Sequence, residues 1–174
     1  YGYGWGTRHH RPPMDLVSLY VDQRPEADLS RARAQAFPQL QIQPTIDAAL
    51  TLGGENLAVD GVLLIAEHGD YPTNELGQKL YPRYEFFREI VDVFQRSSRC
   101  VPVFVDKHLS WNWDWAQEMV ARSKQLGFGL MAGSSVSVTS RLPPAALPLG
   151  ADVEEAICVG IGGPDGYEIH CLEA

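Results

Sequence analysis

Short apolar runs alternate with segments of helical spacing along most of the chain. The clearest run, residues 59–66, is almost unbroken, which is typical of a strand buried on both faces of a sheet. After Pro82 the apolar residues recur at helical spacing, so a long helix is expected there. The other predicted strands are residues 16–20, 40–42, 100–105, 128–132 and 153–161, and the other predicted helices are residues 27–37, 45–52 and 110–127.

This alternation predicts an α/β fold with a Rossmann-like parallel sheet and helices on both of its faces. The length of 174 residues, with 45% hydrophobic and 21% charged residues, is ordinary for a soluble globular domain. A net charge of −8 argues against nucleic-acid binding, and no apolar window is long enough to cross a membrane. We therefore expect a cytoplasmic protein with free thiols at its three cysteines, Cys100, Cys158 and Cys171.

The chain begins at Tyr1 without an initiator Met and without the pattern of a signal peptide. We expect either a processed chain or a segment of a longer protein.

Polar clusters follow four of the predicted strands, at residues 22–24, 67–71, 106–108 and 134–135. In an open parallel sheet, ligands bind outside the carboxyl ends of the strands. The concentration of histidine, lysine and carboxylate side chains at these ends predicts a ligand site along this edge of the sheet.

Individual side chains in these clusters suggest particular roles. Asp22 follows a strand in a position where an acidic residue commonly accepts hydrogen bonds from ribose hydroxyls, and Arg24 is placed either to favour a 2′-phosphate or to face solvent. Lys107 follows a buried strand, where desolvation lowers the pKa of an ammonium and suits it to proton transfer. Three histidines stay open as general acids, metal ligands or structural residues: His68, His108 and His170.

Aromatic residues are frequent just after the predicted ligand edge. Such rings stack on the apolar faces of sugars, and helical packing explains them as well. The residues are Tyr71, Tyr81, Tyr84, Trp111, Trp113 and Trp115.

The order of these motifs resembles the glucose-fructose oxidoreductase / inositol dehydrogenase / MocA family of NAD(P)-dependent oxidoreductases. The matching features are the strand that ends at Asp22, the apolar strand that opens with Val59-Asp60, and Asp106-Lys107-His108 at the family's Glu-Lys-Pro motif. Residues 125–133 are similar to the helix-to-strand passage that follows this motif. The stretch from Gly162-Gly163 to Glu173 resembles a glycine-rich motif that ends in a catalytic histidine, here His170.

The resemblance implies an NAD- or NADP-dependent homo-oligomeric enzyme that acts on a sugar, polyol or related carbonyl compound. Residues 1–135 would form a Rossmann-like domain whose first β-α unit is missing, and residues 136–174 would be a connector and the start of a substrate and oligomerisation domain. Lys107 would bind or protonate the substrate oxygen, and His170 would transfer a proton. The other implied site residues are Asp22, Arg24, Glu67, His68 and Asp106 for the cofactor, and Asp70, Tyr71 and His108 for the substrate.

The chain departs from the family pattern in ways that keep other functions open. His108 replaces the motif's proline, Glu67-His68 stands where Thr-Pro is common, and Gly166 stands at an acidic position. One alternative is a non-redox lyase, isomerase or hydrolase that uses zinc or manganese, and another is a catalytically silent binding or assembly subunit. The candidate metal ligands are Glu67, His68, Asp70, His108 and His170.

Overall fold

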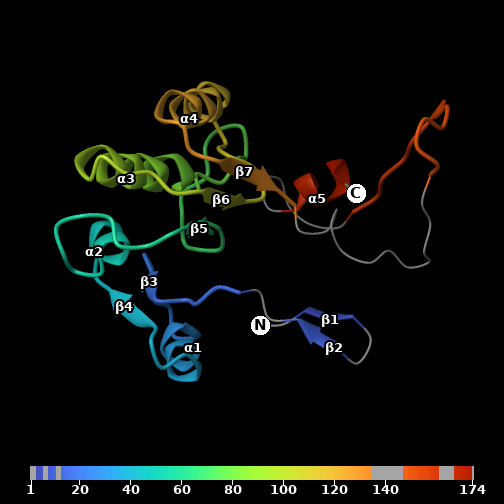
Figure 1. Cartoon of the computed structure of the whole chain (residues 1–174). Coiled ribbons are helices and arrows are strands. Elements are labelled where there is room, and N and C mark those ends of the chain that lie inside the picture. The colour runs from blue at the N-terminus through green and yellow to red at the C-terminus, as the bar shows by residue number, and fades with distance from the viewer. Residues whose placement is uncertain (1–2, 6–7, 11–12, 135–146, 161–166, 174) are drawn as a thin grey trace.

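The protein has an α/β fold with a Rossmann-like arrangement of parallel strands, as its sequence predicts. The computed structural model describes residues 3–5, 8–10, 13–134, 147–160 and 167–173. Strands and helices alternate from β3 to β7 (Figure 1). The elements are β1 (Tyr3–Trp5), β2 (Arg8–His10), β3 (Ser18–Tyr20), α1 (Ser30–Ala36), β4 (Gln41–Gln43), α2 (Ile46–Thr51), β5 (Val62–Leu64), α3 (Arg83–Arg96), β6 (Val103–Asp106), α4 (Trp113–Leu126), β7 (Leu130–Gly133) and α5 (Glu168–Leu172).

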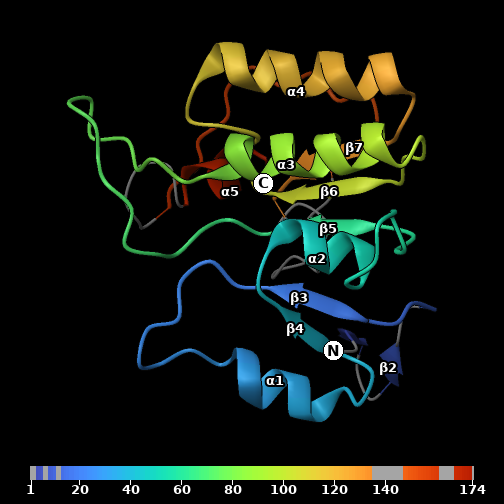
Figure 2. The same ribbon diagram turned by 90° about the vertical axis from the view of Figure 1, so that its left-hand side faces the viewer.

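The parallel strands form two separate ladders. β3 pairs with β4, and β6 lies between β5 and β7 in a three-stranded sheet. Viewed from the side, the strands follow one another in the order β7, β6, β5, β3, β4 (Figure 2). A third pair, the antiparallel β1–β2 hairpin, stands in a glycine-rich segment for which the sequence analysis predicts no strand.

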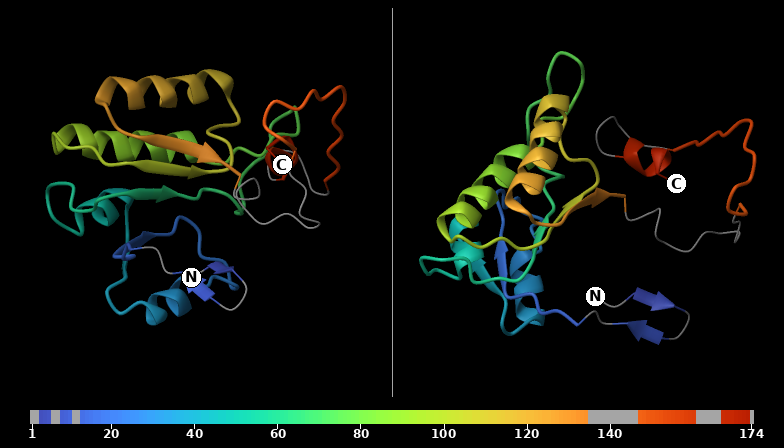
Figure 3. Two further views of the ribbon diagram at one scale, coloured as in Figure 1. Left: turned by 45° about the vertical axis from the view of Figure 1, so that its right-hand side comes forward. Right: turned by 45° about the horizontal axis from the view of Figure 1, so that its top comes forward.

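Helices lie on both sides of the parallel strands. Figure 1 shows α2, α3 and α4 along one side and α1 along the other, and the views in Figure 3 show the same layers from two further directions. The main core lies between the three-stranded sheet and the helices α3 and α4. Its fully buried side chains include Phe87, Phe94, Val103, Val105 and Met119.

Local sequence signals explain where several helices begin and end. Thr45 caps α2 by accepting a hydrogen bond from the Ala48 N–H. Gly127 ends α4 in the left-handed conformation, at a φ of 74° that favours glycine. The helix predicted from residue 110 begins at Trp113 instead, because Asn112 caps it by accepting a hydrogen bond from the Trp115 N–H through its side chain.

The C-terminal part of the chain differs from its prediction. Residues 153–160 of the predicted strand are exposed and have no regular structure, and none of the described strands pairs with them to satisfy their backbone hydrogen bonds. His170 lies in α5, which the sequence analysis does not predict. The positions of Ser135, Ile161, Gly162, Gly163 and Gly166 fall outside the described residues.

The sequence composition predicts free cysteine thiols and no membrane-spanning segment. All three cysteines are free thiols, as predicted. In the part of the chain that the structure describes, no helix has the length and apolar character needed to cross a membrane.

Replacing Phe94 with alanine tests the packing of α3. The ring is fully buried and contacts Phe128 edge-on, with 5.2 Å between ring centroids. We expect Phe94→Ala to lower the free energy of unfolding by about 3–5 kcal/mol, measured by chemical denaturation. Leu76→Ala is the control because Leu76 is 82% exposed, and its effect should stay within about 0.5 kcal/mol. Equal effects at the two positions would contradict the core described above.

Candidate functional site

The candidate site lies at the carboxyl ends of β5, β6 and β7. Glu67 follows β5, Asp106 and Lys107 end β6, and Ser134 follows β7. The parallel register of the three strands aligns these ends on one edge of the sheet. Ligands bind at this edge in open α/β sheets, and here the structure brings Glu67, Asp106 and Lys107 together.

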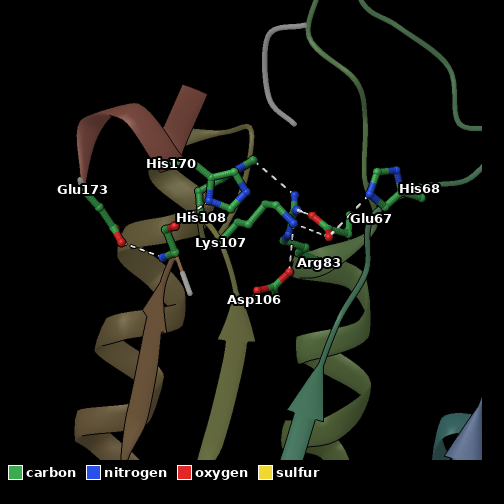
Figure 4. Close-up of polar contacts among 9 residues, drawn as sticks. Glu67, His68, Arg83, Asp106, Lys107, His108, His170 and Glu173 are labelled. Carbon is green, nitrogen blue, oxygen red and sulfur yellow. Dashed lines mark hydrogen bonds and ion pairs between the residues drawn. The ribbon is translucent and has the colours of Figure 1, made fainter. Parts of the chain in front are cut away.

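A cluster of four charged side chains forms the centre of the site (Figure 4). The Lys107 ammonium donates hydrogen bonds to Glu67 Oε1 and, at 3.0 Å, to Asp106 Oδ2. Arg83 Nη2 lies 3.5 Å from Glu67 Oε2, so Glu67 faces two cations at once. We call Glu67, Arg83, Asp106 and Lys107 the ion cluster.

Burial makes the pairing within the ion cluster necessary. Arg83 is 1% exposed and Lys107 is 6% exposed, so neither cation is solvated by bulk water. An unpaired buried charge is strongly destabilising, whereas two cations facing two carboxylates leave the cluster formally neutral. The cluster therefore ties β5, β6 and the start of α3 together at the site.

Two further contacts hold Arg83 in place. Its guanidinium carbon lies 5.1 Å from the centre of the Tyr81 ring, in a cation–π arrangement. Its Nη1 lies 3.1 Å from Nε2 of His108. A guanidinium can only donate, so His108 accepts through Nε2 and carries its proton on Nδ1. This contact occupies Nε2 of His108.

The backbone of Lys107 is in the left-handed region, with a φ of 65°. Its N–H donates to the Gly133 carbonyl at 3.1 Å, which continues the contact between β6 and β7 past the last paired strand residues. The side chains of Asp106 and Lys107 meet, although neighbouring residues of a regular strand point to opposite faces. A strained backbone at a buried cation is characteristic of functional sites.

The expected direction of the Lys107 pKa shift is wrong. Burial is the largest single influence and lowers this pKa. The hydrogen bonds and charges of Glu67 and Asp106 together outweigh burial and raise the pKa of Lys107 above its ordinary value. Lys107 is therefore held as an ammonium, suited to donate hydrogen bonds and to stabilise negative charge.

His170 belongs to a second group of contacts beside the ion cluster. Its Nδ1 is hydrogen-bonded to Ser134 Oγ, and Glu173 Oε2 accepts from the Ser134 N–H (Figure 4). These contacts join α5 to the end of β7. They orient the imidazole and leave its Nε2 without a partner among the described residues.

Asp22 lies at the end of β3 and bridges the two ladders. Its two carboxylate oxygens accept hydrogen bonds from the hydroxyls of Tyr20 and Tyr71, each at 2.8 Å. The Gln23 amide makes two hydrogen bonds to the backbone of Asp70. Burial, with the neighbouring Asp22, raises the pKa of Tyr20 to about 12 and that of Tyr71 above its usual range, so both phenols remain donors.

Several predicted site residues stay at the periphery. The His68 side chain is 67% exposed and lies 3.7 Å from Glu67. Arg24 and Asp70 are exposed as well. Among the described residues no three His, Cys, Asp or Glu side chains are grouped to hold a metal ion, so the five candidate ligands do not form a metal site there.

The aromatic residues mostly pack against the fold. Tyr84 and Trp115 stack with 4.6 Å between ring centroids, and Trp111 meets Trp115 edge-on. The Tyr84 hydroxyl donates to Glu118. These contacts join α3 to α4 and favour the packing explanation over sugar stacking for these three rings.

Arg83 is the main site residue that the sequence pattern does not indicate. It lies at the first turn of α3, away from the predicted polar clusters, and the tertiary fold alone brings it to Glu67. The available signal is a single arginine directly after Pro82, at the start of an apolar helix face.

Compared with protein-family models, curated proteins and solved structures, the chain matches none of them.

Removing the Lys107 ammonium tests the ion cluster. Lys107→Met keeps most of the buried volume but leaves Glu67 and Asp106 without this cation. We expect the free energy of unfolding at pH 7 to fall by about 3–5 kcal/mol, measured by denaturant titration. Lys124→Met on the exposed side of α4 is the matched control and should change stability little. Equal stability of the two variants would contradict the pairing described here.

The same two variants test the raised pKa of Lys107. A pKa higher in the folded than in the unfolded chain gives a stabilisation that is complete below the unfolded value, near 10.5, and is lost as pH rises through the folded value. The stability difference between wild type and Lys107→Met should therefore shrink above about pH 10.5. Tyrosine titration at high pH affects the stability of wild type and of both variants alike, so it cancels in each comparison. The stability difference between wild type and Lys124→Met should therefore stay constant with pH. If the stability difference between wild type and Lys107→Met is independent of pH, the pKa of Lys107 is not raised in the folded protein.

Proposed function

We propose that the protein is an NAD(P)-dependent oxidoreductase that acts on a small carbonyl or hydroxyl compound such as a sugar or polyol. The observation that carries this proposal is the buried Lys107 ammonium, held by two carboxylates at the carboxyl edge of the parallel sheet. The motif order described above supports the same chemistry, because the resembling family places a lysine at this position.

Lys107 is equipped to bind a substrate oxygen. An ammonium has three N–H donors, and Glu67 and Asp106 take two of them. Among the described residues no acceptor takes the third. A carbonyl or hydroxyl oxygen at this donor would meet a fixed positive charge, which stabilises the negative charge that develops on oxygen during carbonyl reduction.

His170 is suited to exchange a proton with the same substrate. Its Nδ1 is engaged by Ser134, so the ring is oriented and Nε2 is the nitrogen left for proton transfer. In this proposal Lys107 binds and polarises the oxygen, and His170 supplies or removes the proton.

The residues at the edge of the sheet fit part of a nicotinamide dinucleotide, which when bound supplies or accepts the hydride. Asp22 is exposed, and its carboxylate has acceptor positions beyond the two that the tyrosine hydroxyls occupy. It can therefore accept hydrogen bonds from ribose hydroxyls. Residues 21–29 between β3 and α1 contain no glycine, so this turn does not supply a cradle for the phosphates.

Cofactor binding is the first test. We expect the protein produced from its complete coding sequence to bind NADH or NADPH in a fluorescence titration. Asp22→Asn should weaken that binding by about tenfold, since a hydrogen bond to a charged group is lost. Asp92→Asn, on an exposed position of α3, is the matched control and should bind as wild type does. Binding of neither cofactor by the wild type would overturn the proposal.

Turnover separates the role of Lys107 from cofactor binding. With a substrate found by screening sugars and polyols at 340 nm, Lys107→Met should lose about 100-fold or more in kcat. Its affinity for the cofactor should change much less, because the role proposed for Lys107 is toward the substrate oxygen. Loss of cofactor affinity with unchanged kcat would contradict this assignment.

A further inference from the structure

β5 has the sequence of a central strand but lies at an edge. Residues 59–66 are almost entirely apolar, a pattern that parallel strands show when both faces of the sheet are covered. In the structure β5 pairs on one side with β6 and on the other side with no strand that is described. Leu63 is 55% exposed and Ile65 is 62% exposed. A flat apolar edge of this kind is a liability that folded proteins normally cover.

The exposed side chains of β5 continue across the sheet. The register places Leu63 beside Phe104 of β6 and Met131 of β7. Their neighbours Leu64, Val103 and Val105 are buried against the helices on the other face, so Leu63, Phe104 and Met131 point away from α3 and α4. Met131 is 65% exposed. One face of the three-stranded sheet is therefore apolar and lacks a helix among the described elements.

β3 does not fill the place beside β5. The two strands share no ladder, and their backbones do not approach each other as those of paired strands do. Figure 2 shows β3 following β5 in the stack of strands, and α2 packs against β3 and β4. At the carboxyl edge the ladders are joined by side chains instead, through Asp22 with Tyr71 and Gln23 with Asp70.

The geometry points to one occupant: we propose that a parallel strand followed by a helix, contributed by polypeptide N-terminal to residue 1, inserts between β3 and β5. The sheet would then be continuous in the order β4, β3, added strand, β5, β6, β7. That is the 3-2-1-4-5-6 order of a dinucleotide-binding sheet, with the added strand as strand 1. The added helix would lie over the added strand and β3, on the face of the sheet where Leu63 is exposed.

Handedness and connection select this occupant. A parallel crossover from the added strand to β3 is right-handed, which places its helix on the same side as α1 and over the uncovered face. The crossover then delivers the chain to the amino end of β3, where residues 13–17 enter it. A second copy of the chain paired edge to edge at β5 would leave β3 unpaired.

The added strand would also complete the candidate site. Its carboxyl end would lie between Asp22 and Glu67, where the turn to the following helix could approach a phosphate group. This consequence rests on the proposed function, whereas the insertion of the strand does not.

Hydrogen exchange tests the insertion directly. Because the Val62 N–H donates to the Pro102 carbonyl, alternation along β5 aims the N–H groups of Leu63 and Ile65 away from β6. In the protein produced from its complete coding sequence, these two amides should exchange more slowly than in residues 1–174 alone, on the order of 100-fold or more. Equal exchange rates in the two proteins would overturn the proposal, and so would a complete coding sequence without a strand and helix before residue 1. Neither readout depends on cofactor binding or turnover.

A lysine at Ile65 provides a second measurement with opposite expected signs. In residues 1–174 alone, Ile65→Lys should reduce self-association measured by analytical ultracentrifugation, because it places a charge on an exposed apolar face. In the complete protein the same change should lower the thermal midpoint of unfolding, because the position would be covered. Leu76 is 82% exposed in the loop before α3. Leu76→Lys should therefore change neither the self-association of residues 1–174 nor the thermal midpoint of the complete protein. If Ile65→Lys instead dissociates a dimer of the complete protein, a second copy is the occupant and the proposal is wrong.

Discussion

Charge pairing beneath the edge of a parallel sheet is the interaction on which the rest of this site depends. Glu67 receives the Lys107 ammonium on one oxygen and faces the Arg83 guanidinium with the other. Neither cation could be buried at this depth alone, because desolvation of an unpaired charge costs several kcal/mol or more. The carboxylates of two neighbouring strands and the first turn of α3 are therefore held together by their charges.

The strands and helices were largely predictable because their signals are local. The apolar run at residues 59–66 contains β5, Thr45 begins the helix predicted at residues 45–52, and Gly127 ends the helix predicted at residues 110–127. Burial of both faces of that run is not met, since Leu63 and Ile65 are exposed. The failures have non-local causes. Residues 153–160 have strand-like composition, but a strand also needs a partner, and sequence composition cannot supply one.

The location of the candidate site could be predicted from the sequence. The charge pairing within the site could not. Asp106 and Lys107 stand together at the end of an apolar strand, so their place at the edge follows from the pattern alone. Glu67 lies 40 positions earlier in the chain, and its contact with Lys107 reverses the direction of the pKa shift that burial alone would give. Arg83 has no local feature that distinguishes it from a surface arginine at a helix start.

The left-handed backbone at Lys107 has an evolutionary consequence. A non-glycine residue with a φ of 65° costs roughly 1–2 kcal/mol relative to an unstrained residue, so glycine or asparagine would suit the backbone better. Those residues would relieve the backbone strain, yet they would leave the buried carboxylates without their ammonium, a loss of about 3–5 kcal/mol that exceeds the gain. The backbone conformation at this position favours glycine or asparagine, whereas the buried carboxylates of Glu67 and Asp106 require a cation. A lysine is expected to persist there only while that positive charge is needed.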